Sequence, residues 1–92
     1  MKVLAVCGFG VGSSMILRMT AEKVFKELGV DADVEATDVS TAQGSSADLI
    51  LTSYELAENL KGQSTPVIPI KHYTNSAEVK EAVEKWLKDK GE

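Results

Sequence analysis

The residues best suited to chemistry lie in one short segment near the amino terminus. The segment reads Cys7-Gly8-Phe9-Gly10-Val11-Gly12-Ser13-Ser14 and follows a short apolar run. Glycines at alternate positions let the backbone turn tightly and aim its N–H groups inward, which creates a cradle for an anion. A helix that begins there adds unpaired N–H groups and about half a positive charge. The segment therefore predicts an anion-binding loop.

Cys7 is the first residue of this loop and the only cysteine of the chain. A thiolate near a helix amino terminus has a lowered pKa and is a competent nucleophile. The donors that favour the thiolate would also hold the oxygens of a phosphoryl group on its sulfur, so we expect Cys7 to carry phosphate. The alternative is a small buried core thiol. The predicted phosphate-binding residues are Gly8, Phe9, Gly10, Val11, Gly12, Ser13 and Ser14; for the two serines, helix capping is a second role that can hold at the same time.

The loop differs from other phosphate-binding patterns. It has no lysine of the kind that ends a Walker loop, and its glycines lack the GxGxxG spacing. Small cysteine phosphatases place an arginine six residues after the cysteine, whereas here that residue is Ser13 and the nearest arginine is Arg18. Without a bidentate cation, the transition state for hydrolysis loses its main charge partner. This favours a carrier that passes phosphate on. A phosphatase, and a non-enzymatic anion-binding or redox-sensor module, remain as alternatives.

Several other residues are weaker candidates for a functional role. His72 follows a predicted strand and could touch phosphate or a partner, although an exposed loop histidine is the simpler interpretation. Asp38 is conceivable as a catalytic acid, but aspartates are also common in turns. Ser53 is expected in the cap region of a helix and could face the loop. Met15 and Met19 fall opposite the core face of their helix and are expected to dock a partner; burial of that helix on two sides is the alternative.

The elements that must position the loop alternate between strands and helices. Short apolar runs typical of buried parallel strands are found at Val3–Val6 and Asp48–Leu51. Two weaker strands are predicted at Asp33–Val39 and at Pro66–Ile70, where prolines suit a sheet edge. The first helix, Ser13–Leu28, has its core face at Leu17, Ala21, Val24 and Leu28 and a stop at Gly29. At most a short helix fits between Ser40 and Ala47.

Two further helices begin with capping-box patterns. Thr52 precedes Glu55 by three residues, and this helix is expected to end at Gly62. Asn75 and Glu78 form the second pair, before an inner face made of Val79, Ala82, Val83, Trp86 and Leu87. The order predicts a single α/β domain over residues 1–92, with a four-stranded parallel sheet, helices on both faces and a phosphatase-like loop after the first strand.

Composition narrows the classes of function. Hydrophobic residues make up 43% and charged residues 26% of 92 residues, as in an ordinary globular protein. A formal net charge of −4 supplies no basic stripe for nucleic acid or anionic lipid. A lone cysteine excludes an internal disulfide and suits the cytoplasm. The apolar run Val3–Cys7 is far shorter than the ~20 residues of a membrane span, so neither a leader nor direct membrane insertion is expected. No metal or cofactor is predicted.

The loop after an apolar strand resembles the IIB components of the bacterial sugar phosphotransferase system, and most of all the ascorbate-type branch of the lactose- and galactitol-like superfamily. The resemblance also covers the Ala47-Asp48-Leu49-Ile50 strand with Thr52-Ser53 after it, and the last helix. It implies a cytoplasmic phosphotransferase that meets the inner face of the membrane through a IIC transporter. Cys7 would take phosphate from a phosphohistidine on a IIA protein and pass it to a sugar, ascorbate or a related one, carried by IIC.

Overall fold

Strands and helices alternate along the chain in the computed structural model, which describes residues 1–6, 11–44, 46–60 and 65–89, with the backbone alone for 11–14. The elements are β1 (Lys2–Val6), α1 (Val11–Glu27), β2 (Asp33–Thr37), α2 (Val39–Gln43), β3 (Leu49–Thr52), α3 (Tyr54–Asn59), β4 (Val67–Pro69) and α4 (Ser76–Asp89). The short helix expected after the second strand is α2. None of the helices in the described part of the chain combines the length and apolar character of a membrane span.

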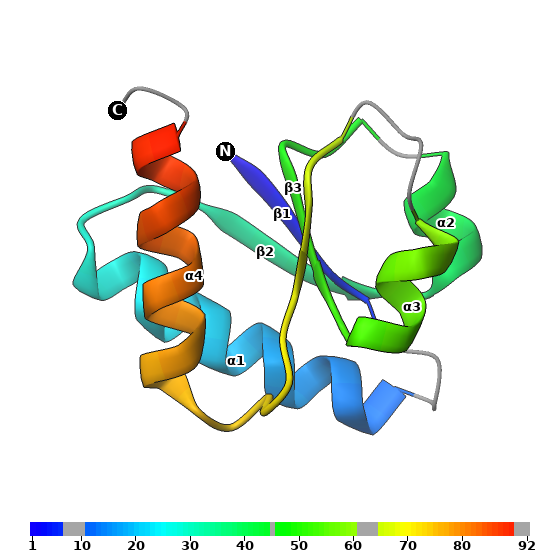
Figure 1. The fold of residues 1–92 in the computed structure, drawn as a ribbon, viewed down its shortest axis with the longest axis horizontal. Helices are drawn as coiled ribbons and strands as arrows, with labels where there is room; N and C mark the ends of the chain where they lie inside the picture. The colour runs from blue at the N-terminus through cyan, green and yellow to red at the C-terminus, as the bar shows by residue number, and fades with distance from the viewer. Residues whose placement is uncertain (7–10, 45, 61–64, 90–92) are drawn as a thin grey trace.

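The four strands form one parallel sheet in the order β2-β1-β3-β4 (Figure 1). β1 is therefore a central strand, with Val6 opposite Thr37 of β2 and Thr52 of β3. β4 is an edge strand, which explains how it accommodates Pro69, while Pro66 directly precedes it. The predicted sheet and its edge strand are confirmed.

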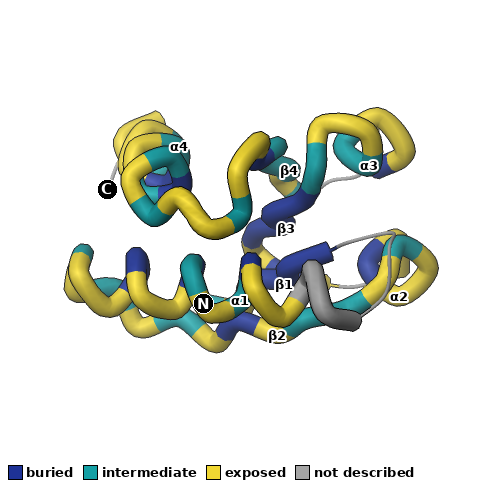
Figure 2. The backbone as a smooth tube through the Cα atoms, turned by 90° about the horizontal axis from the view of Figure 1, so that it is seen from below, coloured by how far each residue is buried: buried dark blue, intermediate teal, exposed yellow. Residues whose placement is uncertain are grey.

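Helices cover both faces of the sheet, as predicted. Successive strand residues point to opposite faces, so β1 contributes Val3 and Ala5 to one core and Leu4 and Val6 to the other. The first core is closed by α1 and α4, which also contact each other, and the second contains Ala42 of α2 and Leu60, the residue after α3. Figure 2 shows buried residues concentrated on β1 and β3 between the two layers.

α1 buries the predicted face and ends at the predicted glycine. Leu17, Ala21 and Val24 are fully buried, and Leu28 packs against them. Gly29 has φ = +73°, a conformation in which a side chain would be strained. The Val30 N–H then donates to the Phe25 carbonyl at 2.9 Å, which satisfies a carbonyl at the helix end. Phe25 is also fully buried, although its position was not part of the predicted face.

Three predicted boundaries are wrong, and side-chain hydrogen bonds set two of them. α1 begins at Val11, so Val11 and Gly12 are in its first turn rather than in a preceding loop. β2 ends at Thr37, because the Asp38 carboxylate accepts a hydrogen bond from the Thr41 N–H and starts α2. The cap of α3 is Ser53, whose hydroxyl accepts from the Leu56 N–H at 3.2 Å, rather than Thr52.

The observed end of α3 and the observed start of α4 agree only in part with the predictions. α3 ends at Asn59, and the predicted stop at Gly62 lies outside the described residues. At the start of α4, the Asn75 side chain accepts from the Glu78 N–H at 3.1 Å, which is half of a capping box. The Glu78 carboxylate completes no box and accepts instead from the N–H groups of Lys71 and His72.

Candidate functional site

The carboxyl ends of the parallel strands define one edge of the sheet. β1 ends there at Val6 and α1 begins at Val11, so residues 7–10 connect the carboxyl end of a central strand to the amino end of a helix. Ligands of open α/β sheets bind outside this edge. Cys7, Gly8, Phe9 and Gly10 lie outside the described residues, as do the side chains of residues 11–14, and their roles remain predictions. The described residues show what surrounds the connection.

Thr52 is attached to the last residue of β1. Its Oγ1 donates a hydrogen bond to the carbonyl oxygen of Val6 over 2.8 Å, and the side chain is 0% exposed. Sequence reasoning assigned Thr52 to a helix cap and missed this contact. The available signal was its position: a hydroxyl at the end of a wholly apolar strand is buried and must find an acceptor nearby.

Ser53 lies at the same edge, one residue further on. Its hydroxyl oxygen caps α3, which confirms the capping interpretation. Ser53 also lines a hollow of about 280 Å³ between the ends of β3 and β4. The other lining residues are Tyr54, Glu55, Ile70, Lys71 and Tyr73. The hollow brings hydroxyl, aromatic and charged groups together next to the strand that pairs with β1.

Asp38 is not prepared to act as a general acid. The hydrogen bond from the Thr41 backbone N–H, 2.8 Å from Asp38 Oδ1, lowers the pKa of this carboxyl. A carboxylate with a lowered pKa holds no proton to donate near neutral pH. The side chain is exposed and its role is to cap α2, as the turn interpretation anticipated.

His72 is an exposed residue of the loop between β4 and α4. Its Nδ1 is 3.1 Å from Glu78 Oε1, and its backbone N–H donates to the same carboxylate oxygen at 3.0 Å. Partial burial raises the pKa of Glu78, but hydrogen bonds from Lys71 and His72 outweigh this effect and hold the pKa below its usual value. The described contacts therefore assign the imidazole to Glu78 and to the amino end of α4.

Met15 and Met19 lie on the solvent face of α1, as predicted, and the interpretation that buries this helix on two sides is wrong. Four large hydrophobic side chains are exposed among the described residues: Met15 (38%), Ile16 (45%), Met19 (66%) and Tyr54 (58%). Three belong to the amino-terminal half of α1 and Tyr54 begins α3, so all four are on helices that start at the carboxyl edge of the sheet. Ile16 and Tyr54 were missed by sequence reasoning.

Arg18 lies on the same helix and forms an ion pair with Glu22, with Nε 3.3 Å from Oε1. Together with Met15 it lines a groove of about 490 Å³ that runs along the edge strand β2 and includes Thr37 and Thr41. The groove contains both signs of charge, because Lys2 and Glu35 also line it and pair at 3.7 Å. Arg18 is therefore engaged within its own helix rather than held toward an anion.

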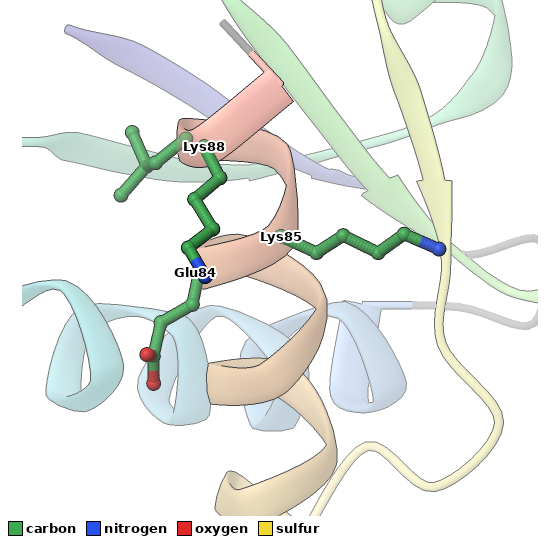
Figure 3. Close-up of a pocket in the computed structure, with 4 residues that line it drawn as sticks. Glu84, Lys85 and Lys88 are labelled. Atoms are coloured by element: carbon green, nitrogen blue, oxygen red, sulfur yellow. The ribbon is translucent and has the colours of Figure 1, made fainter. Parts of the chain in front are cut away.

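A third hollow, of about 380 Å³, lies on α4 and is lined by Glu84, Lys85, Leu87 and Lys88. Figure 3 shows Glu84 and Lys88 on one side of the helix, with Lys85 extending in another direction. All four lining residues come from one helix, so this is a surface depression between long side chains. Within the described residues, no group of three or more His, Cys, Asp or Glu side chains could hold a metal ion.

Solved structures with a similar fold include two proteins of the phosphotransferase system. The lactose-specific IIB domain of the phosphotransferase system from Streptococcus pneumoniae superimposes with a TM-score of 0.60 at 19% identity, over 96% of this chain and 95% of the other. An Enzyme IIB subunit of the phosphotransferase system from Escherichia coli K12 gives 0.57 at 18% identity, over 99% and 95%. The fold is thus that of small α/β phosphotransferase proteins.

Sequence comparison identifies the family. The family model "PTS system, Lactose/Cellobiose specific IIB subunit" matches residues 2–85. An ascorbate-specific EIIB component from Mycoplasma pneumoniae is 32% identical over 90 residues, covering 95% of each chain. Another from Shigella sonnei is 38% identical over 58 residues, covering 61% of this chain and 57% of that protein. The chain belongs to the IIB family: it is a IIB component of the sugar phosphotransferase system, and hence a phosphotransferase.

Proposed function

We propose that Cys7 receives a phosphoryl group from a phosphohistidine of a IIA protein and passes it to a sugar bound by a IIC membrane transporter. The observation that carries the proposal is the position of Cys7, directly after a central strand and before α1 in a glycine-rich segment. Gly8 to Gly12 would supply backbone donors and Ser13 and Ser14 hydroxyls. The IIB protein would work in the cytoplasm and meet the membrane through IIC. Because the full-length relative is ascorbate-specific, ascorbate or a related sugar is the proposed acceptor.

The proposed reaction consists of two displacements at phosphorus. The Cys7 thiolate attacks the phosphorus, the S–P bond forms, and the P–N bond breaks so that the histidine of IIA leaves with the bonding electron pair. A sugar hydroxyl oxygen then attacks the same phosphorus, loses its proton to a base, and releases the Cys7 thiolate. Splitting one difficult step into two is the usual benefit of covalent catalysis. Neither displacement requires a metal or an oxidant from this chain.

Two observations support a carrier over a phosphatase. Ser13 occupies the position where cysteine phosphatases have an arginine, and Arg18 is paired with Glu22 on the helix. Asp38, the candidate acid, caps α2 and has a lowered pKa. A site of neutral donors would stabilise bound phosphate without helping water to attack it.

The exposed apolar residues Met15, Ile16, Met19 and Tyr54 are proposed to dock the IIA and IIC partners, and we name them the apolar rim. Phosphate can move only if a donor closes over Cys7, and this requires a contact surface next to the connection between β1 and α1. Apolar side chains that remain exposed in one region are typical of interaction sites. Met15 and Met19 suit this task because methionine adapts to more than one surface, and both partners must reach the same residue.

The test is labelling by a phosphorylated IIA protein, followed by mass spectrometry. We expect one phosphate on the parent chain, none on Cys7→Ser, and a stable label in the absence of a IIC acceptor. A phosphatase would release phosphate continuously, and a redox sensor would accept none. The Cys7→Ser protein should unfold at nearly the same temperature as the parent. Equal labelling of Cys7→Ser would contradict the proposal, and a loss of more than ~2 kcal/mol of stability would place the thiol in the core.

A further inference from the structure

A buried hydroxyl at the end of β3 is not explained by packing alone. Thr52 is 0% exposed and stands at the last position of a strand whose other residues are Leu49, Ile50 and Leu51. Burying a hydroxyl costs free energy unless it makes a hydrogen bond, and valine would fill almost the same space without that cost. The reason for a threonine at this position must therefore be sought in what its hydroxyl contacts.

That contact is the carbonyl oxygen of Val6, 2.8 Å from Thr52 Oγ1. Val6 and Thr52 are register partners on neighbouring strands, and both are the last residues of their strands. The Val6 carbonyl belongs to the peptide group that joins Val6 to Cys7. A peptide group is planar, so holding its oxygen sets the plane in which the chain leaves β1.

The backbone of Thr52 is fixed from the other side. Its carbonyl oxygen accepts a hydrogen bond from the Ile70 N–H at 2.6 Å, which ties it to the end of the edge strand β4. The next residue, Ser53, starts α3 by capping it. The backbone of Thr52 is thus fixed by β4 and α3. The hydrogen bond from its side chain to Val6 therefore restrains the end of β1.

We propose that the Thr52 hydroxyl is a positioning group for phosphoryl transfer: it holds the Val6 carbonyl and so fixes the direction in which β1 delivers Cys7. The inference rests on the function proposed for Cys7. In-line displacement at phosphorus requires the attacking atom within a narrow range of distance and angle, and an error of about 1 Å can cost about 100-fold in rate. The Thr52 hydroxyl orients the peptide group that precedes the nucleophile. It can therefore influence the distance and angle of attack without touching the substrate.

The experiment compares the parent chain of 92 residues with three variants. Thr52→Val removes the hydroxyl at nearly constant volume, Thr52→Ser retains it, and Ile50→Val weakens the packing of β3 at the neighbouring inward position on the same face. For each we would measure the single-turnover rate constant at saturating phosphorylated IIA (kcat) and the IIA concentration that gives half of it (KM). We would also measure the thermal unfolding temperature and the pH midpoint of Cys7 alkylation by iodoacetamide. The alkylation requires no partner protein.

We expect Thr52→Val to lower kcat about tenfold or more with little change in KM. Its alkylation midpoint should rise toward the value of about 8.5 of a free thiol, because the thiolate loses aligned donors. Thr52→Ser should stay within about threefold of the parent in kcat, and Ile50→Val should match the parent in both readouts even if it unfolds earlier. If Thr52→Val does not fold, the pair Thr52→Ser and Thr52→Ala, which differ by the hydroxyl alone, replaces it in the same comparison.

Two results would overturn the proposal. One is a Thr52→Val protein with the parent's kcat and alkylation midpoint. The other is a loss of rate in Ile50→Val equal to that in Thr52→Val, which would show that general weakening of β3 is responsible. Failure of the proposed function is a separate result: the parent itself would then take no label on Cys7, while the alkylation midpoints would still decide whether Thr52 positions this residue.

Discussion

α4 crosses α1 on one face of the sheet (Figure 1), where the two helices contact each other, and their inner faces are alike. α1 buries Leu17, Ala21 and Val24, and α4 buries Val79 and Val83 in the same core. Their outer faces differ. α4 exposes charged residues, namely Glu81, Glu84, Lys85, Lys88 and Asp89. α1 exposes Met15, Ile16 and Met19 in its amino-terminal half, and shows charged residues such as Lys23 and Lys26 further along.

The amino ends of the two helices also differ, because only α4 has an acidic residue in its first turn. The first turn of α4 contains Glu78, whose carboxylate is bound by backbone N–H groups within the protein. The first turn of α1 contains no acidic residue. Because both helices share one structural task, the packing of the core does not account for these differences. At the end nearest Cys7, α1 therefore departs from the pattern of a polar, internally capped helix, and this is where a charged ligand and partner proteins are expected.

The largest expected effect is on stability: truncating a residue on the inner face of α1 should cost far more free energy of unfolding than truncating one on its outer face. Leu17→Ala should lower the free energy of unfolding by about 3 kcal/mol, because a fully buried leucine leaves a cavity when truncated. Met19→Ala, at an exposed position of the same helix, should change it by less than about 0.5 kcal/mol. Urea unfolding of both variants measures the difference. Similar losses would mean that the outer face of α1 is buried and that the contrast with α4 is mistaken.

An intermediate effect is expected on the reaction. The double variant Met15→Asp with Met19→Asp should slow transfer from phosphorylated IIA about tenfold, because it removes apolar contact and adds charge of the same sign as the incoming phosphate. The unfolding temperature should stay close to that of the parent. Stopped-flow or quench-flow labelling measures the rate.

The matched control for this variant lies on α4. Lys85→Ala with Lys88→Ala makes the same change in net charge on a helix without exposed large apolar residues, and its transfer rate should match the parent's. A rate unchanged in the methionine variant would show that partners dock elsewhere. Equal slowing in both double variants would show that net charge, rather than the apolar rim, governs the encounter.

The smallest expected effect concerns the internal cap of α4. Glu78→Gln should lower stability by about 1 kcal/mol at pH 7, because the amide is a weaker acceptor than the carboxylate for the N–H groups of Lys71 and His72. The transfer rate should not change. Chemical denaturation at several pH values measures the effect.

The pH dependence of that difference has a definite sign. The pKa of Glu78 is lower in the folded protein than its ordinary value of 4.5, so the unfolded chain takes up the proton first as pH falls. The advantage of the parent over Glu78→Gln is therefore complete above about pH 4.5 and is lost as pH falls through the lowered pKa. An advantage that grew on acidification would contradict the assigned contacts.

Much of the fold was predictable because it depends on the pattern of apolar residues and on glycines that end helices. Val3–Val6 could be recognised as a buried strand, the spacing from Leu17 to Leu28 defined the inner face of α1, and Gly29 marked its end. The outer position of Met15 and Met19 followed from the same helical geometry. These features are local, because each depends on residues that are close together in the sequence.

The sequence could not predict which hydrogen-bond partner each hydroxyl or carboxyl group binds when several partners lie within reach. Thr52 and Ser53 are equally good caps in sequence, and strand register decides that Thr52 faces Val6 while Ser53 caps α3. Glu78 could have closed a capping box, but the path of the chain after β4 brings two N–H groups to its carboxylate. Both outcomes depend on contacts between segments that are brought together only by the complete sheet.

The central place of β1 in the sheet also has a consequence for how the protein matures. Among the four strands of the sheet, β1 is synthesised before the others, yet Thr52, whose hydroxyl binds the Val6 carbonyl, follows 46 residues after Val6. Non-local pairing of this kind is slow, because a long loop must close before the contact forms. A nascent or truncated chain that ends before β3 thus lacks the Thr52 hydroxyl that binds the Val6 carbonyl. The phosphate acceptance proposed for Cys7 should therefore arise late in folding, after β3 has paired with β1.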